Sequence, residues 1–571
     1  MVLGVEGENI RDVDVSKINR VWLRYYDEWV RDSLEIPEIP LFSLLENSAK
    51  ENPEKTAVVF FGKEIRFGEL DALSNRLAGF LRSIGIKKGD GVMLAMPNIP
   101  HYVISYYAVL KAGGIVVQAN PIYTERELRH ISENSEAKTA IIFEPVFNNL
   151  RGLLEDNTVE NVVVCRVEEY LPFPLNFLYR LKKEKVRIPN DSRIHSWKDA
   201  LSHEELKERP EINPREDVAV FQYTGGTTGF PKAAMLTHYN LVANVYQTIE
   251  WIPERGKGDI FLGVLPYFHV FGMTTSMNAP IAVGAKIIML PDPRDIKRII
   301  QAIDKYRVTI FCGVPTLFNA VMNHPDLKKH DLTSLKACIS GAAPLPVELK
   351  RAFEAETGAK LIEGYGLSET SPVTHGNPFY GLNKEGSIGI PFPETYAVVI
   401  DEEGKILPAG EIGELAIYGP QVMKGYYRME EETKKTLVNG WLLTGDMARM
   451  DGDGYFYIVD RKKDVIIAGG YNIYPREVEE VLYEHPAVLE CAVIGVPDKY
   501  RGETVKAFIV LREEYKGKVD EREIEEFCRE RLAAYKVPRI IEFVDELPKS
   551  AVGKILRRVL REREIRKIQE S

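Results

Sequence analysis

The sequence predicts an α/β protein in which a large N-terminal domain of layered sheets and helices, with a β-rich subdomain, precedes a small α+β C-terminal domain. The chain has 571 residues, and at about 150 residues per domain this length corresponds to roughly three or four folding units. From about Leu41, short apolar runs alternate with amphipathic stretches, as helices packed on a sheet require. After about Gly364 the pattern changes to short, Gly-rich strands, and after Lys463 to a compact mixture of helices and strands.

The first part of the chain supplies buried strands between amphipathic helices. One helical stripe ends at Gly85, a residue type that favours helix termination. We predict strands at residues 92–96, 115–117 and 139–143. Because these runs are continuously apolar, we expect a parallel sheet buried on both faces. The residues of the stripe are Leu73, Leu77, Phe80, Leu81 and Ile84.

Residues 171–193 interrupt this pattern. Their sequence, LPFPLNFLYRLKKEKVRIPNDSR, combines prolines, aromatic residues and a basic cluster without the period of a strand. We interpret the segment as an inserted surface loop. Such composition favours an ordinary solvated loop that covers a small hydrophobic cluster. The alternative is a segment whose apolar and basic side chains contact an anionic membrane surface.

The remaining elements follow the three parts of the predicted fold. The α/β pattern resumes at Asp217 and continues to about Gly364, and the β-rich unit extends to about Asp460. The predicted strands before Gly364 are residues 217–223, 260–265, 286–290, 308–313 and 337–340. Beyond Lys463, the predicted helices are residues 478–483 and 524–532, and the predicted strands are residues 492–496, 507–511 and 540–544.

Composition excludes several classes of protein. The formal net charge of −10 argues against nucleic-acid binding, which needs many Lys and Arg contacts to phosphate. The five cysteines are scattered and form no CxxC pair, so neither a disulfide framework nor a zinc site is predicted. The N-terminus lacks a secretory signal, and no run approaches the ~20 apolar residues that span a bilayer. We therefore expect a cytoplasmic protein.

A glycine- and threonine-rich segment, Y-T-G-G-T-T-G-F-P-K from Tyr223 to Lys232, follows an apolar strand. Its glycines let the backbone N–H groups approach an anion, while threonine hydroxyls and a lysine add further donors, so the segment predicts a polyphosphate-binding loop. It is not a Walker A loop, because Gly-Lys-Ser/Thr is absent. A flexible glycine turn is the alternative. The candidate ligands are Thr224, Gly225, Gly226, Thr227, Thr228, Gly229 and Lys232.

This decapeptide resembles the signature of the adenylate-forming superfamily, which includes acyl-CoA synthetases, firefly luciferase and peptide-synthetase adenylation domains. The resemblance covers about Leu41 to Arg558, and further motifs follow in the expected order. It implies that ATP activates a carboxylic acid to an acyl-adenylate with release of pyrophosphate, and that CoA then takes the acyl group with release of AMP. The implied cofactors are ATP and Mg²⁺, with CoA as co-substrate.

The same resemblance assigns nucleotide-binding residues. In E-G-Y-G-L-S-E, from Glu363 to Glu369, Tyr365 is expected to stack on adenine, Ser368 to contact phosphate and Glu369 to hold Mg²⁺. Asp446 is expected to bind the ribose hydroxyls and Arg461 to lie beside the ribose. The further expected ATP-site residues are Gly341, Ala342, Ala343, Glu363, Gly364 and Gly366.

The resemblance also implies a mobile C-terminal domain. Domains of residues 1–462 and 463–571 are expected to be joined at a hinge at Lys463. Lys554 of the small domain is expected to stabilise the negative charge that develops on the α-phosphate. Gly469, Gly470 and Tyr471 are the candidates for the CoA tunnel. The expected catalytic residues are Lys554, Thr228, Glu369 and His269.

The acid is expected to be apolar. His269, in L-P-Y-F-H-V-F-G, resembles the histidine that orients the acyl carboxylate, and neither residues 271–275 nor residues 312–315 include a charged side chain. The strongest resemblance is to long-chain fatty-acid–CoA ligases. The alternatives are a medium-chain or aryl acid–CoA ligase, acyl transfer to a separate carrier protein, a luciferase-like monooxygenase and a non-enzymatic acyl-nucleotide sensor. The sequence leaves a homodimer open. The predicted acyl-binding residues are His269, Phe271, Met273, Cys312 and Val314.

Overall fold

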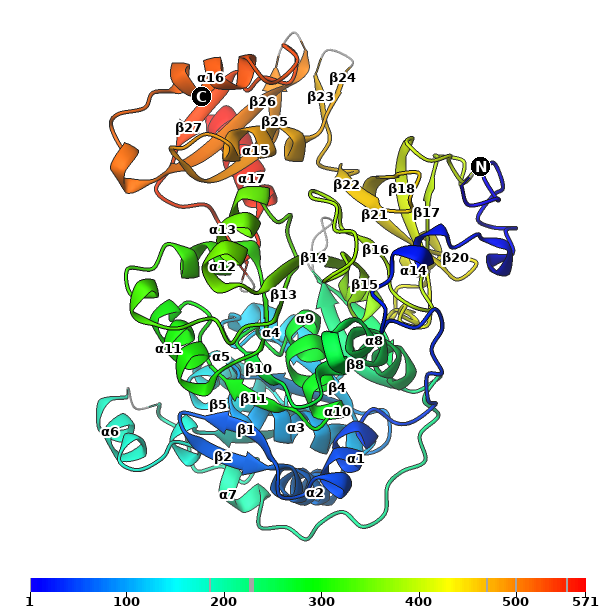
Figure 1. The fold of residues 1–571 in the computed structure, drawn as a ribbon. Coiled ribbons are helices and arrows are strands. Elements are labelled where there is room, and N and C mark those ends of the chain that lie inside the picture. Colours follow the sequence, from blue (N-terminus) through cyan, green and yellow to red (C-terminus); the bar gives the residue numbers. More distant parts are fainter. Residues whose placement is uncertain are drawn as a thin grey trace.

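Two large sheets with helices between them form the body of the computed structural model (Figure 1), which describes residues 2–183, 186–224, 231–468, 471–498, 501–550 and 553–570. The eight-stranded sheet has the order β19-β9-β8-β4-β3-β5-β6-β7. Its strands from β8 to β7 pair in parallel, whereas β9 and β19 add in antiparallel fashion at one edge. The strands are β3 (Gly91–Ala95), β4 (Ile115–Ala119), β5 (Thr139–Phe143), β6 (Asn161–Cys165), β7 (Ile194–Ser196), β8 (Val218–Thr224), β9 (Lys232–Thr237) and β19 (Gly425–Tyr426).

The nine-stranded sheet has the order β16-β15-β14-β13-β12-β10-β11-β1-β2. Its central strands, from β14 to β1, pair in parallel, and antiparallel strands flank them at both edges. The strands are β1 (Thr56–Phe60), β2 (Lys63–Arg66), β10 (Ile260–Gly263), β11 (Lys286–Met289), β12 (Ile310–Gly313), β13 (Ala337–Ser340), β14 (Lys360–Gly366), β15 (Val373–Gly376) and β16 (Ile390–Pro391).

Alternating side chains of the strands divide the large domain into three cores. Val58 and Val92, from different sheets, share one core with α2 (Phe67–Ser83) and α3 (Pro100–Lys111), which lie between the sheets. The outer face of the eight-stranded sheet packs on α4 (Glu125–Ser135) and α5 (Phe147–Glu155). The outer face of the nine-stranded sheet packs on α11 (Ile296–Tyr306), α12 (Pro315–Met322) and α13 (Val347–Thr357).

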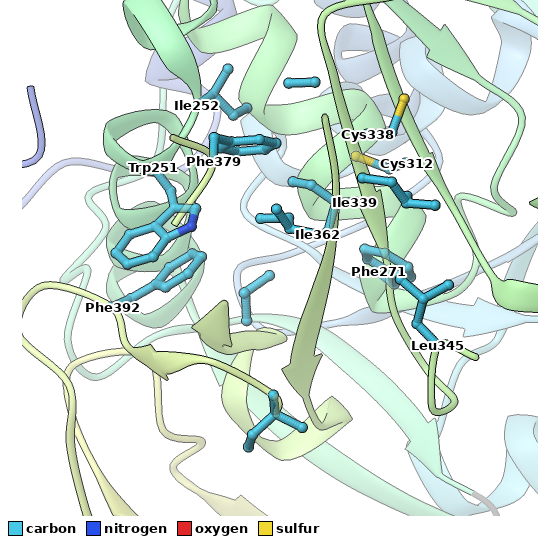
Figure 2. Close-up of a cluster of buried hydrophobic side chains, with 14 of the residues drawn as sticks. Trp251, Ile252, Phe271, Cys312, Cys338, Ile339, Leu345, Ile362, Phe379 and Phe392 are labelled. Atoms are coloured by element: carbon cyan, nitrogen blue, oxygen red, sulfur yellow. The ribbon is translucent and has the colours of Figure 1, made fainter. Parts of the chain in front are cut away.

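Figure 2 shows part of this last core, at the end of the sheet that carries β13 and β14. The rings of Trp251 and Phe392 stack with centroids 4.3 Å apart. Trp251 ends α8 (His238–Trp251), whose first turn is capped by the Thr237 side chain. The dense packing fixes the ends of β13 and β14, and both ends carry predicted site residues.

A third sheet forms the predicted β-rich subdomain. Its antiparallel strands have the order β17-β18-β21-β20, and β22 pairs with β21. The strands are β17 (Tyr396–Ile400), β18 (Ile412–Tyr418), β20 (Leu437–Val438), β21 (Trp441–Met450) and β22 (Phe456–Arg461), with α14 (Glu430–Thr436) before β20.

The small C-terminal domain has its own sheet and its own cores. Two clusters of buried apolar side chains are made only of residues between Ile466 and Leu560. In Figure 1 the domain lies beyond α12, α13 and β14 of the large domain. The fold class predicted from the sequence is confirmed. The elements are β23 (Ile466–Ala468), β24 (Tyr471–Ile473), α15 (Pro475–Tyr483), β25 (Val488–Asp498), β26 (Gly502–Leu511), α16 (Glu521–Arg529), β27 (Ile540–Phe543) and α17 (Arg557–Glu570).

Two features differ from the sequence prediction. Strand β9, between the glycine-rich segment and α8, was not anticipated. Residues 171–193, interpreted as a loop, include the helix α6 (Leu175–Lys182). The helix was missed because its apolar side chains face outward, so the usual apolar-inward periodicity gives no indication of its packing. Among the described residues, no helix is both long and apolar enough to span a bilayer.

Candidate active site

The predicted phosphate-binding segment is closed at its base by two paired strands. Thr224, the last residue of β8, lies opposite Lys232, the first residue of β9. Gly225, Gly226, Thr227, Thr228 and Gly229 lie outside the described residues. Lys232 was predicted to add charge to this segment, and its Nζ lies 2.6 Å from Oε2 of Glu432 in α14 and 5.2 Å from the ring centroid of Tyr426. Lys232 therefore has a protein partner at the edge of the segment.

The predicted metal ligand, Glu369, is oriented by β19. The hydroxyl of Tyr426 donates to Oε1 of Glu369 at 2.8 Å, and the backbone carbonyl of Glu369 accepts from Met423 N–H. Before it, the chain turns at Gly366, where a Cβ atom would lie only 2.0 Å from the Pro372 carbonyl oxygen, so this position requires glycine. Sequence reasoning missed Tyr426, since no motif marks it.

Asp446 lies in a polar cluster with Tyr365 and Arg461. The Tyr365 hydroxyl donates to Oδ2 of Asp446 at 2.6 Å, and Nε of Arg461 lies 3.3 Å from Oδ1. Asp446 and Arg461 are direct partners across β21 and β22, and Asp446 is buried. The ring of Tyr365, expected to stack on adenine, packs edge-on against His375. The carboxylate, phenol and guanidinium thus form one preassembled site with hydrogen-bonding capacity for hydroxyl groups.

Lys554 of the small domain lies beside this cluster. Burial lowers the pKa of Lys554 to about 8, helped by the positive charge of Arg461 and opposed by Asp446. Its backbone is fixed by a turn, because Ser550 N–H donates to the Lys554 carbonyl at 2.8 Å. The Thr316 hydroxyl of the large domain donates to the Gly553 carbonyl at 3.2 Å. The two domains therefore meet at the position of this lysine.

Arg557, the first residue of α17 and three residues after Lys554, ties this helix to the segment around the predicted hinge. Its Nη1 lies 3.0 Å from Asp460 and 3.6 Å from Asp464, and it also pairs with Glu479. Its position shows an ion-pair network that holds the start of α17 and, through it, the turn that carries Lys554.

His269 faces the same region from the large domain. It caps α9 (Val270–Met273) by accepting from Phe271 N–H at 3.3 Å. Burial, with a smaller effect of the Lys554 charge, lowers the pKa of His269 to about 4, so the imidazole is neutral at pH 7. A neutral imidazole next to an ammonium group suits orientation of a carboxylate by hydrogen bonding.

The predicted acyl-binding side chains line the end of β12 and the helix after His269. Phe271, Met273, Cys312 and Val314 are all buried. Figure 2 shows Phe271 close to Leu345, and Cys312 beside Cys338. Burial raises the pKa of Cys312 to about 11, so its thiol is uncharged. A π-helical turn over Thr274–Asn278 directly follows α9, a geometry that is frequent at functional sites.

The segment after β13 brings the acyl and nucleotide residues together. Gly341 N–H donates to the Gly313 carbonyl at 3.1 Å, and a Cβ at Gly341 would lie 3.0 Å from the Phe271 ring. Ala342 has a φ of 67°, and Ala343 follows it in the same turn. Gly364, between Glu363 and Tyr365, lies opposite Gly376 of β15. Ser368 begins the short helix that carries Glu369.

Of the predicted CoA residues, Tyr471 lies apart from this cluster. Tyr471 is exposed on β24, where its ring stacks on Tyr535 at 4.6 Å. Among the described residues, no hydrogen bond or ring contact joins it to Tyr365 or Lys554. Gly469 and Gly470 lie outside the described residues. The present domain orientation therefore gathers the residues predicted for adenylation and leaves Tyr471 elsewhere.

Comparisons with known proteins agree with this geometry. A family model described as AMP-binding enzyme matches residues 45–427, and one described as AMP-binding enzyme C-terminal domain matches residues 477–554. The first match alone covers more than half of the chain. The chain is therefore an enzyme of the AMP-binding family, and the resemblance to adenylate-forming enzymes is confirmed.

Individual proteins of known name are similar to this chain over nearly its whole length. The chain is 50% identical to the long-chain-fatty-acid–CoA ligase of Bacillus subtilis (strain 168), over 95% of this chain and 98% of that protein. It is 38% identical to the protein of the same name from Escherichia coli O6:H1, over 95% and 98%. Among solved structures, the anthranilate CoA ligase AuaEII in complex with anthranoyl-AMP superposes with a TM-score of 0.83 at 29% identity, covering 94% of this chain and 99% of that one.

Proposed function

We propose that this enzyme is an ATP-dependent, AMP-forming acid–CoA ligase whose acid is a long-chain fatty acid. The observation that carries the proposal is the contact between the turn of Lys554, in the small domain, and Thr316 of the large domain, which brings Lys554 within electrostatic reach of Asp446, Arg461 and His269. One site thus offers groups for a ribose, a developing phosphate charge and a carboxylate. The buried, uncharged lining around Phe271 supports an apolar acid, as does the name of the Bacillus subtilis relative.

The chemistry follows from these positions. A carboxylate oxygen attacks the α-phosphorus of ATP, a P–O bond forms, and the bond to pyrophosphate breaks. The Lys554 ammonium stabilises the negative charge that accumulates on the α-phosphate oxygens. In the second step the CoA sulfur attacks the acyl carbonyl, its proton leaves to solvent, and the C–O bond to AMP breaks. We propose that the small domain turns about Lys463 between the steps and moves Lys554 away and the loop of Gly469, Gly470 and Tyr471 inward.

The overall reaction is tested with the purified protein, ATP, Mg²⁺ and straight-chain acids of graded length, each with and without CoA. AMP, pyrophosphate, acyl-adenylate and thioester are quantified. We expect thioester formation to favour long chains over medium-chain and aryl acids. Adenylate without thioester for every acid would reject the CoA ligase and direct attention to a separate carrier protein. A preference for benzoate or a medium-chain acid would reject the long-chain assignment alone.

The Glu369 carboxylate is suited to be a ligand of Mg²⁺. The carboxylate is half-buried and oriented through Oε1 by Tyr426, and Mg²⁺ in nucleotide sites commonly uses one or two carboxylates plus phosphate oxygens and water. When bound, the ion would neutralise charge on the phosphates. The residues Thr224 to Gly229 and Ser368 are proposed to contact the phosphates.

Glu369→Gln is expected to raise the Mg²⁺ concentration for half-maximal adenylation by at least about tenfold, because a charged oxygen ligand becomes neutral. Tyr426→Phe, which removes only the orienting hydroxyl, should raise it by up to about tenfold. The measurement is a Mg²⁺ titration of pyrophosphate release at fixed ATP. As a control, Glu431→Gln on exposed α14 should match the wild type. An unchanged Mg²⁺ dependence of Glu369→Gln would remove this residue from the metal site.

We also propose that the enzyme is cytoplasmic and docks on anionic membranes through α6, which lies at the periphery of the large domain (Figure 1). Its apolar side chains face solvent: Phe177 is 57% and Leu181 68% exposed. The end of the helix is held to the protein by Lys183, the residue after α6, which pairs with Glu168 at 2.6 Å and with Glu144. Exposed Lys182 lies beside the apolar face and supplies charge that complements anionic lipid headgroups.

Phe177→Ser combined with Leu181→Ser is expected to weaken binding to phosphatidylglycerol vesicles by at least about tenfold, since each apolar side chain contributes roughly 1.5–3 kcal/mol when buried. Vesicle co-sedimentation measures this, with phosphatidylcholine vesicles as the uncharged comparison. The matched control is Ile122→Ser, because Ile122 is 75% exposed away from α6. Equal binding by all three proteins, or an equal loss in Ile122→Ser, would contradict docking through α6.

A further inference from the structure

Arg476 connects the small domain to the strand that carries the nucleotide motif. It lies in the first turn of α15, and its Nη2 is 3.6 Å from Oε1 of Glu363 in β14, two residues before Tyr365. Both side chains are 7% exposed. Glu363 was predicted as a nucleotide-site residue, whereas sequence reasoning gave Arg476 no role. Burying a carboxylate without a partner costs free energy, so the Arg476 guanidinium stabilises the buried Glu363 carboxylate in β14.

The other contacts of Arg476 tie it to the large domain at two further segments. Nη1 donates to the Ile458 carbonyl of β22 at 3.0 Å, and Nη2 lies 3.5 Å from the Gly386 carbonyl. Its backbone N–H donates to Oδ2 of Asp460 at 2.9 Å. The planar guanidinium therefore bridges three separate segments of the large domain, and a point charge such as a lysine ammonium cannot reproduce this geometry.

We propose that Arg476 is a positioning residue for acyl-adenylate formation: by pairing with Glu363 it holds the small domain in the orientation that presents Lys554 to the nucleotide site. This inference rests on the proposed role of Lys554. Arg476 and Glu363 lie on opposite sides of Lys463, so a rotation of the small domain about that residue separates them. Separation removes the guanidinium partner of Glu363, and the pair therefore favours the orientation for adenylate formation over the orientation for thioester formation.

The Arg476–Glu363 pair is buried, which distinguishes it from a surface ion pair. Burial raises the pKa of Glu363 to about 7, while the charge of Arg476 and the hydrogen bond from Leu345 N–H lower this pKa. Leu345 N–H donates to Oε2 of Glu363 at 3.3 Å, so the carboxylate is held from both sides. Two other charged groups shift the pKa of Glu363: Glu480 raises it and Lys350 lowers it. Of the two, Glu480 contacts Arg476 directly, with its Oε1 3.2 Å from Nε.

The test separates the two half-reactions in single turnovers. One assay follows pyrophosphate release from acid and ATP, and the other follows thioester formation from CoA and supplied acyl-adenylate. Arg476→Ala is expected to slow the first about tenfold, the range typical of coupling between sites, and to leave the second unchanged or faster. Arg476→Lys should lie between Arg476→Ala and the wild type. In a double-mutant cycle with Glu363→Gln, the losses in the first assay should be less than additive.

Controls distinguish the failure of this inference from that of the proposed function. Glu480→Gln, which removes the partner of Arg476 within the small domain, should leave both assays within about twofold of the wild type. Lys554→Ala, measured in parallel, tests the proposed function: retained adenylation in that variant would reject it. If Lys554→Ala loses adenylation and Arg476→Ala loses both half-reactions equally, or neither, only the positioning role is overturned. If Arg476→Ala does not fold, the same comparison made with Arg476→Lys decides.

Discussion

Replacing Lys554 by alanine is expected to slow acyl-adenylate formation several hundredfold, because a fixed donor at a developing oxyanion contributes about 3–4 kcal/mol to the transition state. Thioester formation from supplied acyl-adenylate should change much less. Lys549→Ala is the matched control, since Lys549 lies in the same loop but pairs with Glu490 of β25 at 2.7 Å. Equal losses of both half-reactions in Lys554→Ala would reject the division of roles.

The pH dependence of the same step provides a second readout for Lys554. Because the ammonium is the active form and burial lowers the pKa of Lys554 to about 8, the protonated fraction falls as the pH rises through that value. The kcat/KM for adenylation, which reports the free enzyme, should therefore decline above about pH 8 and be retained below it. The decline should be absent from the residual activity of Lys554→Ala. An alkaline limb that persists in this variant would assign the titration to another group.

Replacing Asp446 by alanine is expected to raise the KM for ATP by about 10- to 100-fold, as loss of a charge-assisted hydrogen bond to a ribose predicts. The change also removes the acceptor of the Tyr365 hydroxyl and the partner of Arg461, both of which now hold the carboxylate in place. Asp446→Asn keeps one acceptor oxygen and should have a smaller effect.

Initial rates at varied ATP, with acid and CoA saturating, measure this change, and the KM for CoA serves as the internal comparison. Asp453→Asn is a control from the turn between β21 and β22, where the side chain pairs with Lys384 and Arg24. It should leave the KM for ATP unchanged. If Asp446→Ala lowers kcat with an unaltered KM for ATP, the ribose contact would be wrong.

Two strands with continuous apolar runs were predicted to the residue. Thr139–Phe143 and Ala337–Ser340 have the predicted bounds, because both are central strands whose two faces are buried and whose pattern leaves no alternative. The helix α6 escaped prediction for the opposite reason. Four of its apolar side chains face solvent, and contact with the large domain is made by Tyr179 and, just after the helix, by Lys183, so local periodicity carries no information about which face is covered.

By itself, the sequence determined the family, and through the resemblance it predicted nucleotide-site roles for Tyr365, Asp446, Arg461 and Lys554. Only the tertiary structure decided which of these side chains are neighbours. Asp446 contacts Tyr365 and Arg461, Arg557 pairs with Asp460 and Arg476 with Glu363 between the two domains, and Tyr426 orients Glu369 from β19. Such contacts join residues far apart in the chain, and their geometry depends on the packing of whole domains, which no local pattern encodes.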